Sequence, residues 1–100
     1  MKLLTAKNRK DLPALYAQDG KGDEAIAYVK FFNPCGSWTL YITEFDGEDR
    51  FFGYVRDLDN ELGYFSLSEL ASARGKMGLP IERDRFFGKH TLQEVMDKAL

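Results

Sequence analysis

The chain has 100 residues, of which 44% are hydrophobic, 14% aromatic and 30% charged, and its net charge at pH 7 is -2. This length predicts one domain, residues 1–100, with a single core, and the aromatic content argues against disorder. The small net charge gives no overall attraction for nucleic acid. No apolar run approaches the ~20 residues that span a bilayer, and one cysteine cannot form an internal disulfide. We therefore expect a cytoplasmic protein that makes no membrane contact.

The first segment, residues 5–18, reads as helical, and Thr5 is a typical N-cap. Pro13 lacks a backbone N–H and disfavours helical geometry at the residue before it, so we expect two short pieces or one kinked helix. Apolar residues that would share one helical face recur at the required spacing: Leu4, Leu12, Leu15 and Tyr16.

Four strands are expected next, at residues 24–32, 37–43, 50–56 and 62–65. Asp46-Gly47 predicts a hairpin between the second and third of them, because its turn type needs positive φ. Loops of two or four residues both place Trp38, Leu40 and Ile42 on one face with Phe51 and Val55. A three-residue loop would turn one strand over.

The remaining chain predicts two further helices. Ser66 with Glu69, and Thr91 with Glu94, have the spacing of capping boxes. Pro80 makes the segment between them irregular or a short edge strand. The C-terminal helix has an apolar stripe of Leu92, Val95, Met96 and Ala99. The order predicts an α+β fold: an antiparallel meander of about four strands, with an N-terminal, a middle and a C-terminal helix packed mainly on one face.

Four strings of this chain, YVKFFNP, SWTLYITEFDGEDRFFGYV, ELGYFSLSEL and GLPIERDRFF, resemble the bacterial family called domain of unknown function 2958. The resemblance covers most of the chain. It implies a small single-domain bacterial protein, of a kind often carried on mobile genetic elements. It implies no activity, so no catalytic residue or cofactor follows from it.

Four carboxylates crowd the hairpin: Glu44, Asp46, Glu48 and Asp49. Oxygen ligands of this kind suit Mg²⁺ or Ca²⁺, and a metal-assisted hydrolase is one reading. A two-residue loop would place Glu44 opposite Asp49, where they could share an ion. The reading we favour is a solvated hairpin tip, since turn geometry alone accounts for Asp-Gly.

Nucleophilic catalysis has little support in the sequence. Ser66 lies at a strand-to-helix junction, but the G-x-S-x-G pattern is absent and capping accounts for it. A Ser–His or Cys–His catalytic pair would have to use His90, the one histidine of the chain. Cys35 lies in a predicted turn, and we interpret it as a turn residue. One cysteine and one histidine cannot close a zinc site within one chain.

Aromatic and basic residues are the other candidates. A sheet face carrying Tyr41, Phe52 and Tyr54 would, if uncovered, be a partner surface or a dimer interface. Arg83, Arg85 and Lys89 flank Phe86-Phe87, a mixture found in binders of single-stranded nucleic acid. The interleaved Glu82 and Asp84 favour local pairing instead, and we expect both phenylalanines to be buried.

These patterns favour a protein that acts by binding and not by catalysis, with another protein as its partner. The hypothesis is an inhibitor or modulator of a host protein, such as a defence nuclease, encoded by a mobile element. The alternatives are the metal-assisted hydrolase and a nucleic-acid-binding protein. A homodimer is also compatible with the sequence.

Overall fold

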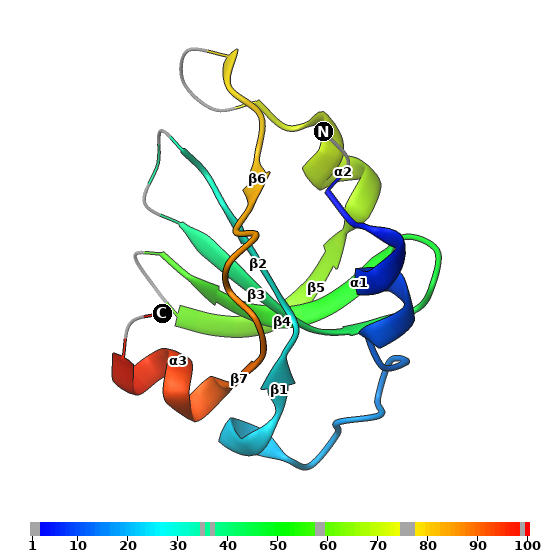
Figure 1. The fold of residues 1–100 in the computed structure, drawn as a ribbon, viewed down its shortest axis with the longest axis vertical. Coiled ribbons are helices and arrows are strands. Elements are labelled where there is room, and N and C mark those ends of the chain that lie inside the picture. The colour runs from blue at the N-terminus through cyan, green and yellow to red at the C-terminus, as the bar shows by residue number, and fades with distance from the viewer. Residues whose placement is uncertain (1–2, 35, 37, 58–59, 75–77, 99) are drawn as a thin grey trace.

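The computed structural model describes residues 3–34, 36, 38–57, 60–74, 78–98 and 100, and their fold is α+β (Figure 1). Five strands form one antiparallel sheet in the order β5-β4-β3-β2-β6, and β1 pairs with β7 in a separate two-stranded sheet. The strands are β1 Ile26–Ala27, β2 Val29–Phe32, β3 Thr39–Phe45, β4 Arg50–Arg56, β5 Asn60–Ser66, β6 Glu82–Arg83 and β7 His90–Thr91. The helices are α1 Ala6–Asp11, α2 Leu67–Ser72 and α3 Leu92–Lys98, with a short 3-10 helix η1 at Gly22–Glu24.

The expected hairpin is present as β3 and β4, but its register changes along its length. Leu40 lies opposite Val55, which is the register of a four-residue loop. Nearer the tip Phe45 lies opposite Phe51 and the Asp46 N–H donates to the Arg50 carbonyl at 2.9 Å, which is the register of a three-residue loop, Gly47–Asp49. A β-bulge between Ile42 and Glu44 absorbs the difference, because an extra residue on one strand reverses the alternation of its side chains. The predicted apolar face therefore survives. Glu44 lies opposite Phe52 and not Asp49, so the expected carboxylate pairing is wrong.

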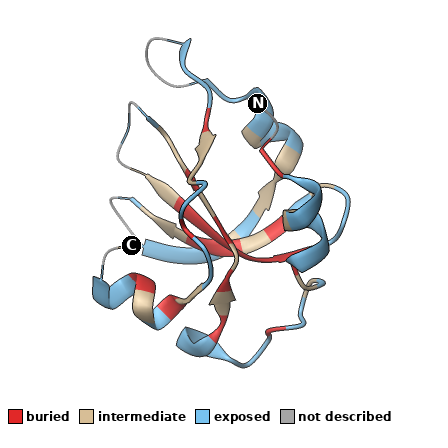
Figure 2. Ribbon diagram, viewed as in Figure 1, coloured by how far each residue is buried: buried red, intermediate tan, exposed pale blue. Residues whose placement is uncertain are grey.

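Each face of the sheet packs against its own hydrophobic cluster. Buried residues are red in Figure 2 and concentrate in the central strands of the sheet. The first cluster joins the predicted face to α1 and α2 and contains Leu4, Leu12, Phe31, Leu40, Ile42, Phe45, Phe51 and Ile81. The second joins the opposite face to α3 and contains Ala25, Ala27, Tyr41, Tyr54, Phe87, Leu92 and Val95. The helices thus cover both faces, where the sequence pattern suggested mainly one.

The N-terminal helix is one short piece. Thr5 caps α1 in a capping box with Asn8, and the helix ends at Asp11, with Leu12 as its C-cap directly before Pro13. Leu12 is buried in the first cluster as expected. Tyr16 does not share a helical face with it: its φ is +70° and its side chain is 66% exposed. That part of the expectation is wrong.

The expected strand at residues 24–32 divides at Tyr28 into β1 and β2, which belong to different sheets. The segment after Pro80 supplies β6, the short edge strand that Pro80 predicted. Among the described residues, no helix is long and apolar enough to cross a membrane. The expectations for Cys35 and Ala99 concern residues outside those that the structure describes.

Candidate interaction surface

Glu44 is a buried carboxylate that holds the loop after α1. Its two oxygens accept the backbone N–H groups of Tyr16 and Gln18, each at 2.8 Å. The residue is only 4% exposed, so these bonds replace the water that its charge would otherwise need. Both oxygens of Glu44 therefore serve to organise the loop after α1.

The other tip carboxylates have structural partners of their own. The Asp46 side chain accepts the backbone N–H groups of Glu48, Asp49 and Arg50 at 2.8–3.0 Å. These bonds, that of Glu48 first, lower the pKa of Asp46. Within the described part of the chain, no three His, Cys, Asp or Glu side chains gather as a metal site would need. The geometry thus gives the metal-assisted reading no support.

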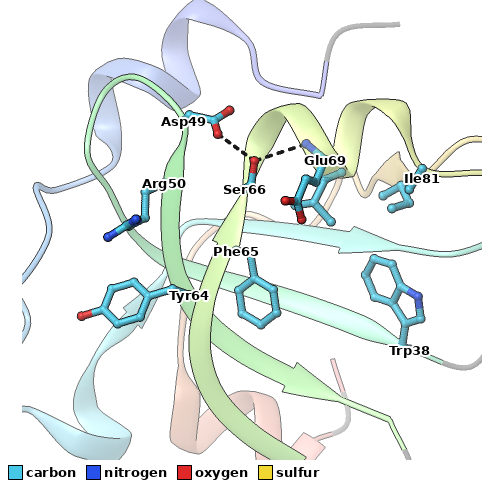
Figure 3. Close-up of a pocket in the computed structure, with 10 residues that line it drawn as sticks. Trp38, Asp49, Arg50, Tyr64, Phe65, Ser66, Glu69 and Ile81 are labelled. Atoms are coloured by element: carbon cyan, nitrogen blue, oxygen red, sulfur yellow. Dashed lines mark hydrogen bonds between the residues drawn. The ribbon is translucent and has the colours of Figure 1, made fainter.

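Asp49 links the hairpin tip to the start of α2 (Figure 3). Its carboxylate accepts the hydroxyl of Ser66 at 2.7 Å and the backbone N–H of Ser68 at 2.7 Å. The Ser66 oxygen in turn accepts the N–H of Glu69, as the expected cap. The Ser66 hydroxyl, first among several causes, lowers the pKa of Asp49, which makes this carboxylate a poor base. Ser66 is accounted for as a cap, and we assign it no catalytic role.

Among the residues that the structure describes, those lining the hollow beside Ser66 include no histidine or cysteine, and so no Ser–His or Cys–His pair. The hollow measures about 720 Å³ and lies between the sheet and α2, lined by Trp38, Phe65, Leu70 and Ile81 among others. The one histidine, His90, lies beside Phe87 of the second cluster: its Nε2 is 2.8 Å from the Phe87 carbonyl oxygen, and its Nδ1 is 3.6 Å from Glu94. The site is an open groove with a capped helix at its edge.

The face that would be a partner surface if uncovered is covered at Tyr41 and Tyr54. Tyr41 is 1% and Tyr54 is 7% exposed, beneath α3 and Phe87. The Tyr41 hydroxyl donates to the Leu100 carbonyl, and burial raises the pKa of Tyr41. Arg56 donates to the Val95 carbonyl at 2.9 Å, which also holds α3 in place. These two tyrosines are core residues and cannot meet a partner.

The same sheet face remains open at its other end, around Phe52. Phe52 lies opposite Tyr64, and Tyr54 lies opposite Leu62, so Leu62 and Tyr64 of β5 extend the face beyond α3. Leu62 is 52% and Tyr64 50% exposed. Together with Tyr16 they border a cleft of about 460 Å³. We call Tyr16, Phe52, Leu62 and Tyr64 the tyrosine surface.

The loop after α1, which carries Tyr16, is held by buried hydrogen bonds. Gln18 is 7% exposed, and its side chain bonds the Ile26 N–H, the Ile26 carbonyl and the Thr43 carbonyl at 2.6–2.9 Å. Tyr16 occupies the left-handed region, which costs energy for a residue with a Cβ and persists only where the surroundings impose it. Glu44 and Gln18 impose it here, and the result is an outward-pointing Tyr16.

The aromatic rings of this surface contact one another. Phe52 and Tyr64 meet edge to face with centroids 5.1 Å apart, and the Arg50 guanidinium lies 5.8 Å from the centre of the Tyr64 ring. A hydrogen bond to the Tyr16 side chain raises the pKa of Tyr64. The tyrosine surface is thus an ordered set of exposed rings with hydroxyl groups at its edge.

The C-terminal basic segment is divided between structural and exposed groups. Arg83 donates to the Leu3 carbonyl at 2.6 Å, and the Lys89 ammonium lies 5.8 Å from the centre of the Tyr28 ring. Phe87 is 6% exposed, as expected, whereas Phe86 is 90% exposed, so the expectation that it is buried is wrong. Arg85 is exposed beside it.

The comparison with family models decides the family. The model described as "Protein of unknown function (DUF2958)" matches residues 3–100. The chain belongs to this family. No curated protein and no solved structure matches it. The DUF2958 family carries no activity in its description, so the site has to be judged on its own geometry.

In this DUF2958 chain, the sequence contains a signal for two residues of the tyrosine surface, Leu62 and Tyr64. Leu62 and Tyr64 alternate with Glu61 and Gly63, and this period-2 pattern indicates one apolar strand face. The role of Tyr16 could not be predicted from the sequence, because it depends on Glu44, which lies 28 residues away in the chain.

Proposed function

We propose that this protein is a non-catalytic binding module that docks another protein on the tyrosine surface. The observation that carries the proposal is the exposure of Tyr16, Leu62 and Tyr64, each at least half open to solvent, on one side of a firmly held loop. Tyrosine is enriched at protein interfaces because it buries a large ring and still offers a hydroxyl group. A rigid surface of this kind also loses little side-chain freedom on binding.

The proposal is tested by affinity capture from a bacterial lysate. We expect the wild type to retain a partner that a Tyr16→Ala/Leu62→Ala/Tyr64→Ala variant loses. Phe86→Ala is the matched control, since it removes an exposed ring elsewhere on the molecule. Identical partners for the wild type and the triple variant would contradict the proposal.

The partner that we propose is a host protein, which docking inhibits or modulates. The support is the resemblance to a family often carried on mobile elements, whose proteins meet host defences. The plating efficiency of a phage on a host with a restriction nuclease measures whether the protein inhibits that defence. We expect the wild type, and not the triple variant, to raise plating efficiency, and equal plating with both would count against the host role.

A second candidate function is contact with single-stranded nucleic acid, and Phe86 is the observation that favours it. A phenylalanine that is 90% exposed and lines a hollow together with Arg85 offers a base a stacking partner and its phosphate a cation. Anisotropy of a labelled single-stranded DNA at low salt tests it. Affinity should fall with added salt and with Phe86→Ala but not with Tyr64→Ala. An absence of binding at low salt would rule this function out.

A further inference from the structure

We propose that the partner binds by strand addition, as an extended basic segment of another protein that pairs with the free edge of β5. This inference rests on the proposed function and specifies how the tyrosine surface is used. β5 is the terminal strand of the five-stranded sheet, and its seven residues, Asn60–Ser66, contain no proline and no lysine. Among the described residues, no strand pairs with its outer edge. Lysine, proline and very short length commonly protect such an edge, and β5 has none of them, so we take this edge as available for pairing.

The hydrogen-bond pattern identifies the groups that a new strand would meet. The Leu67 N–H donates to the Asp49 carbonyl at 2.7 Å, which places these residues in a hydrogen-bonded position of the ladder. Such positions alternate along antiparallel strands, so the ladder to β4 uses Phe65, Gly63 and Glu61. The residues between them direct their N–H and carbonyl groups away from β4: Asn60, Leu62 and Tyr64.

The same alternation joins the edge to the tyrosine surface. The residues whose backbone groups point outward also have their side chains on one face, and two of them are Leu62 and Tyr64. In an added antiparallel strand, every second side chain would lie on this face, beside the exposed leucine and tyrosine. Those positions of the partner should be apolar.

Charge selects the other positions of the partner. Residues 57–69 carry four acids, Asp57, Asp59, Glu61 and Glu69, and no Lys, Arg or His. Glu61 lies on the strand itself and is exposed. Lysine or arginine at the alternate positions would lie on the Glu61 side of the sheet and would be attracted to it.

The acids also argue against a second copy of this chain as the occupant. The seven residues of β5 contain Glu61 and no Lys, Arg or His, so a second β5 strand would bring a further negative charge and no cation. Two like charges on neighbouring strands repel each other. A basic heterologous strand avoids this repulsion.

A peptide of alternating valine and lysine, about eight residues long like a natural strand, is the probe. We expect saturable amide shifts, followed by nuclear magnetic resonance, along β5 and largest at Asn60, Leu62 and Tyr64. Glutamate in place of lysine should weaken binding at least about tenfold. No saturable shift at millimolar peptide, equal binding of the glutamate peptide, or concentration-dependent pairing of the protein through β5 would overturn the inference.

Methylated peptides provide a matched test that leaves the protein unchanged. In an antiparallel pair the valine N–H groups point to β5 and the lysine N–H groups point to solvent. Methylation of the valine nitrogens should therefore abolish binding, and methylation of the lysine nitrogens should preserve it. Equal effects of the two methylations would show that no ladder forms.

The protein side is tested with Leu62→Pro against Leu62→Ala. Both remove the leucine, but only proline removes an outward N–H, and the β4 ladder does not use that group. Circular dichroism confirms folding, and the proline variant should bind the peptide at least about tenfold more weakly than the alanine variant. If both variants bind alike while the triple variant loses its captured partner, strand addition is wrong and the proposed function stands. If capture survives in the triple variant while the peptide binds, the proposed function fails by itself.

Discussion

Glu44 is the residue on which the candidate surface depends. Its carboxylate lies in the sheet but bonds to the loop that presents Tyr16, so the sheet and the loop are held in one arrangement. The β-bulge beside Ile42 gives Glu44 this position. A regular strand would place a different residue towards the loop, and the two N–H groups would lose their acceptor.

Glu44→Gln should therefore destabilise the protein although it is nearly isosteric. Both carboxylate oxygens accept N–H groups, so the glutamine NH₂ must face a donor in either orientation. A buried unmatched donor costs about 1–3 kcal/mol. Urea unfolding measures this loss, and Glu48→Gln, at the exposed tip, is the control. Equal midpoints for the two variants would show that Glu44 does not hold the loop.

Gly53 is a second residue whose identity follows from packing. A Cβ at this position would lie 2.3 Å from the Tyr41 carbonyl oxygen, which is backbone and cannot move aside. Gly53→Ala should cost about 3 kcal/mol, in the range of an overpacked core. Its neighbour across the ladder provides the control: at Gly63 the nearest atom is 3.9 Å away, so Gly63→Ala should fold normally. Thermal melting of both variants measures the difference, and a stable Gly53→Ala would contradict the close approach.

At the scale of elements, the β3–β4 hairpin shows how far the sequence determines structure. The alternation of Trp38, Leu40 and Ile42 and the Asp46-Gly47 turn were sufficient to predict its strands and its apolar face. They were not sufficient to predict the bulge, because Thr43 fits a regular strand as well as a bulged one. Only the distant partners of Glu44 distinguish the two registers.

For the C-terminal helix, the sequence predicts that it packs against the sheet but not which face it covers. The apolar stripe of Leu92, Val95 and Met96 predicted that α3 packs against the sheet. Leu92 and Val95 are buried, whereas Met96 is 38% exposed, so that part of the prediction is wrong. Local periodicity could not say which face α3 covers. The sequence therefore leaves open whether Tyr41 is covered. In the structure it is buried, and the open part of that face lies further along, at Tyr64.

The hairpin tip should make the protein's stability sensitive to acid. Hydrogen bonds lower the pKa of Asp46 and of Asp49 in the folded state. These hydrogen bonds stabilise the folded state at pH values above the ordinary aspartate pKa of 3.8. This stabilisation is lost as the pH falls through the lower pKa values of the folded state. Asp46→Asn/Asp49→Asn keeps acceptors at both positions but cannot titrate there.

We expect the wild type to lose more stability than this double variant between about pH 6 and about pH 3. Urea midpoints at each pH measure the loss. Glu48→Gln removes a charge from the same tip without removing these bonds and is the control. Parallel losses in the wild type and the double variant would show that the tip contributes nothing to acid sensitivity.

At the scale of the whole molecule, the two clusters lie on opposite faces of one sheet and share its strands. Leu40 and Tyr41 are neighbours in β3 but belong to different clusters. Loss of either cluster would leave one side of the same strands in water. The clusters should therefore unfold together, as small single domains usually do.

Val95→Ala tests this cooperativity from the far side of the sheet. Val95 is fully buried in the α3 cluster, so its truncation should cost about 2 kcal/mol. The single tryptophan, Trp38, packs against the other cluster, and its fluorescence reports on that side alone. If the two clusters unfold together, the variant must shift the fluorescence transition and the circular dichroism transition by the same amount, with an unchanged slope.

Met96→Ala, on the exposed side of α3, is the control and should shift neither transition by much. A fluorescence transition that stays in place while the dichroism transition moves would mean that α3 and its cluster unfold separately from the rest of the sheet.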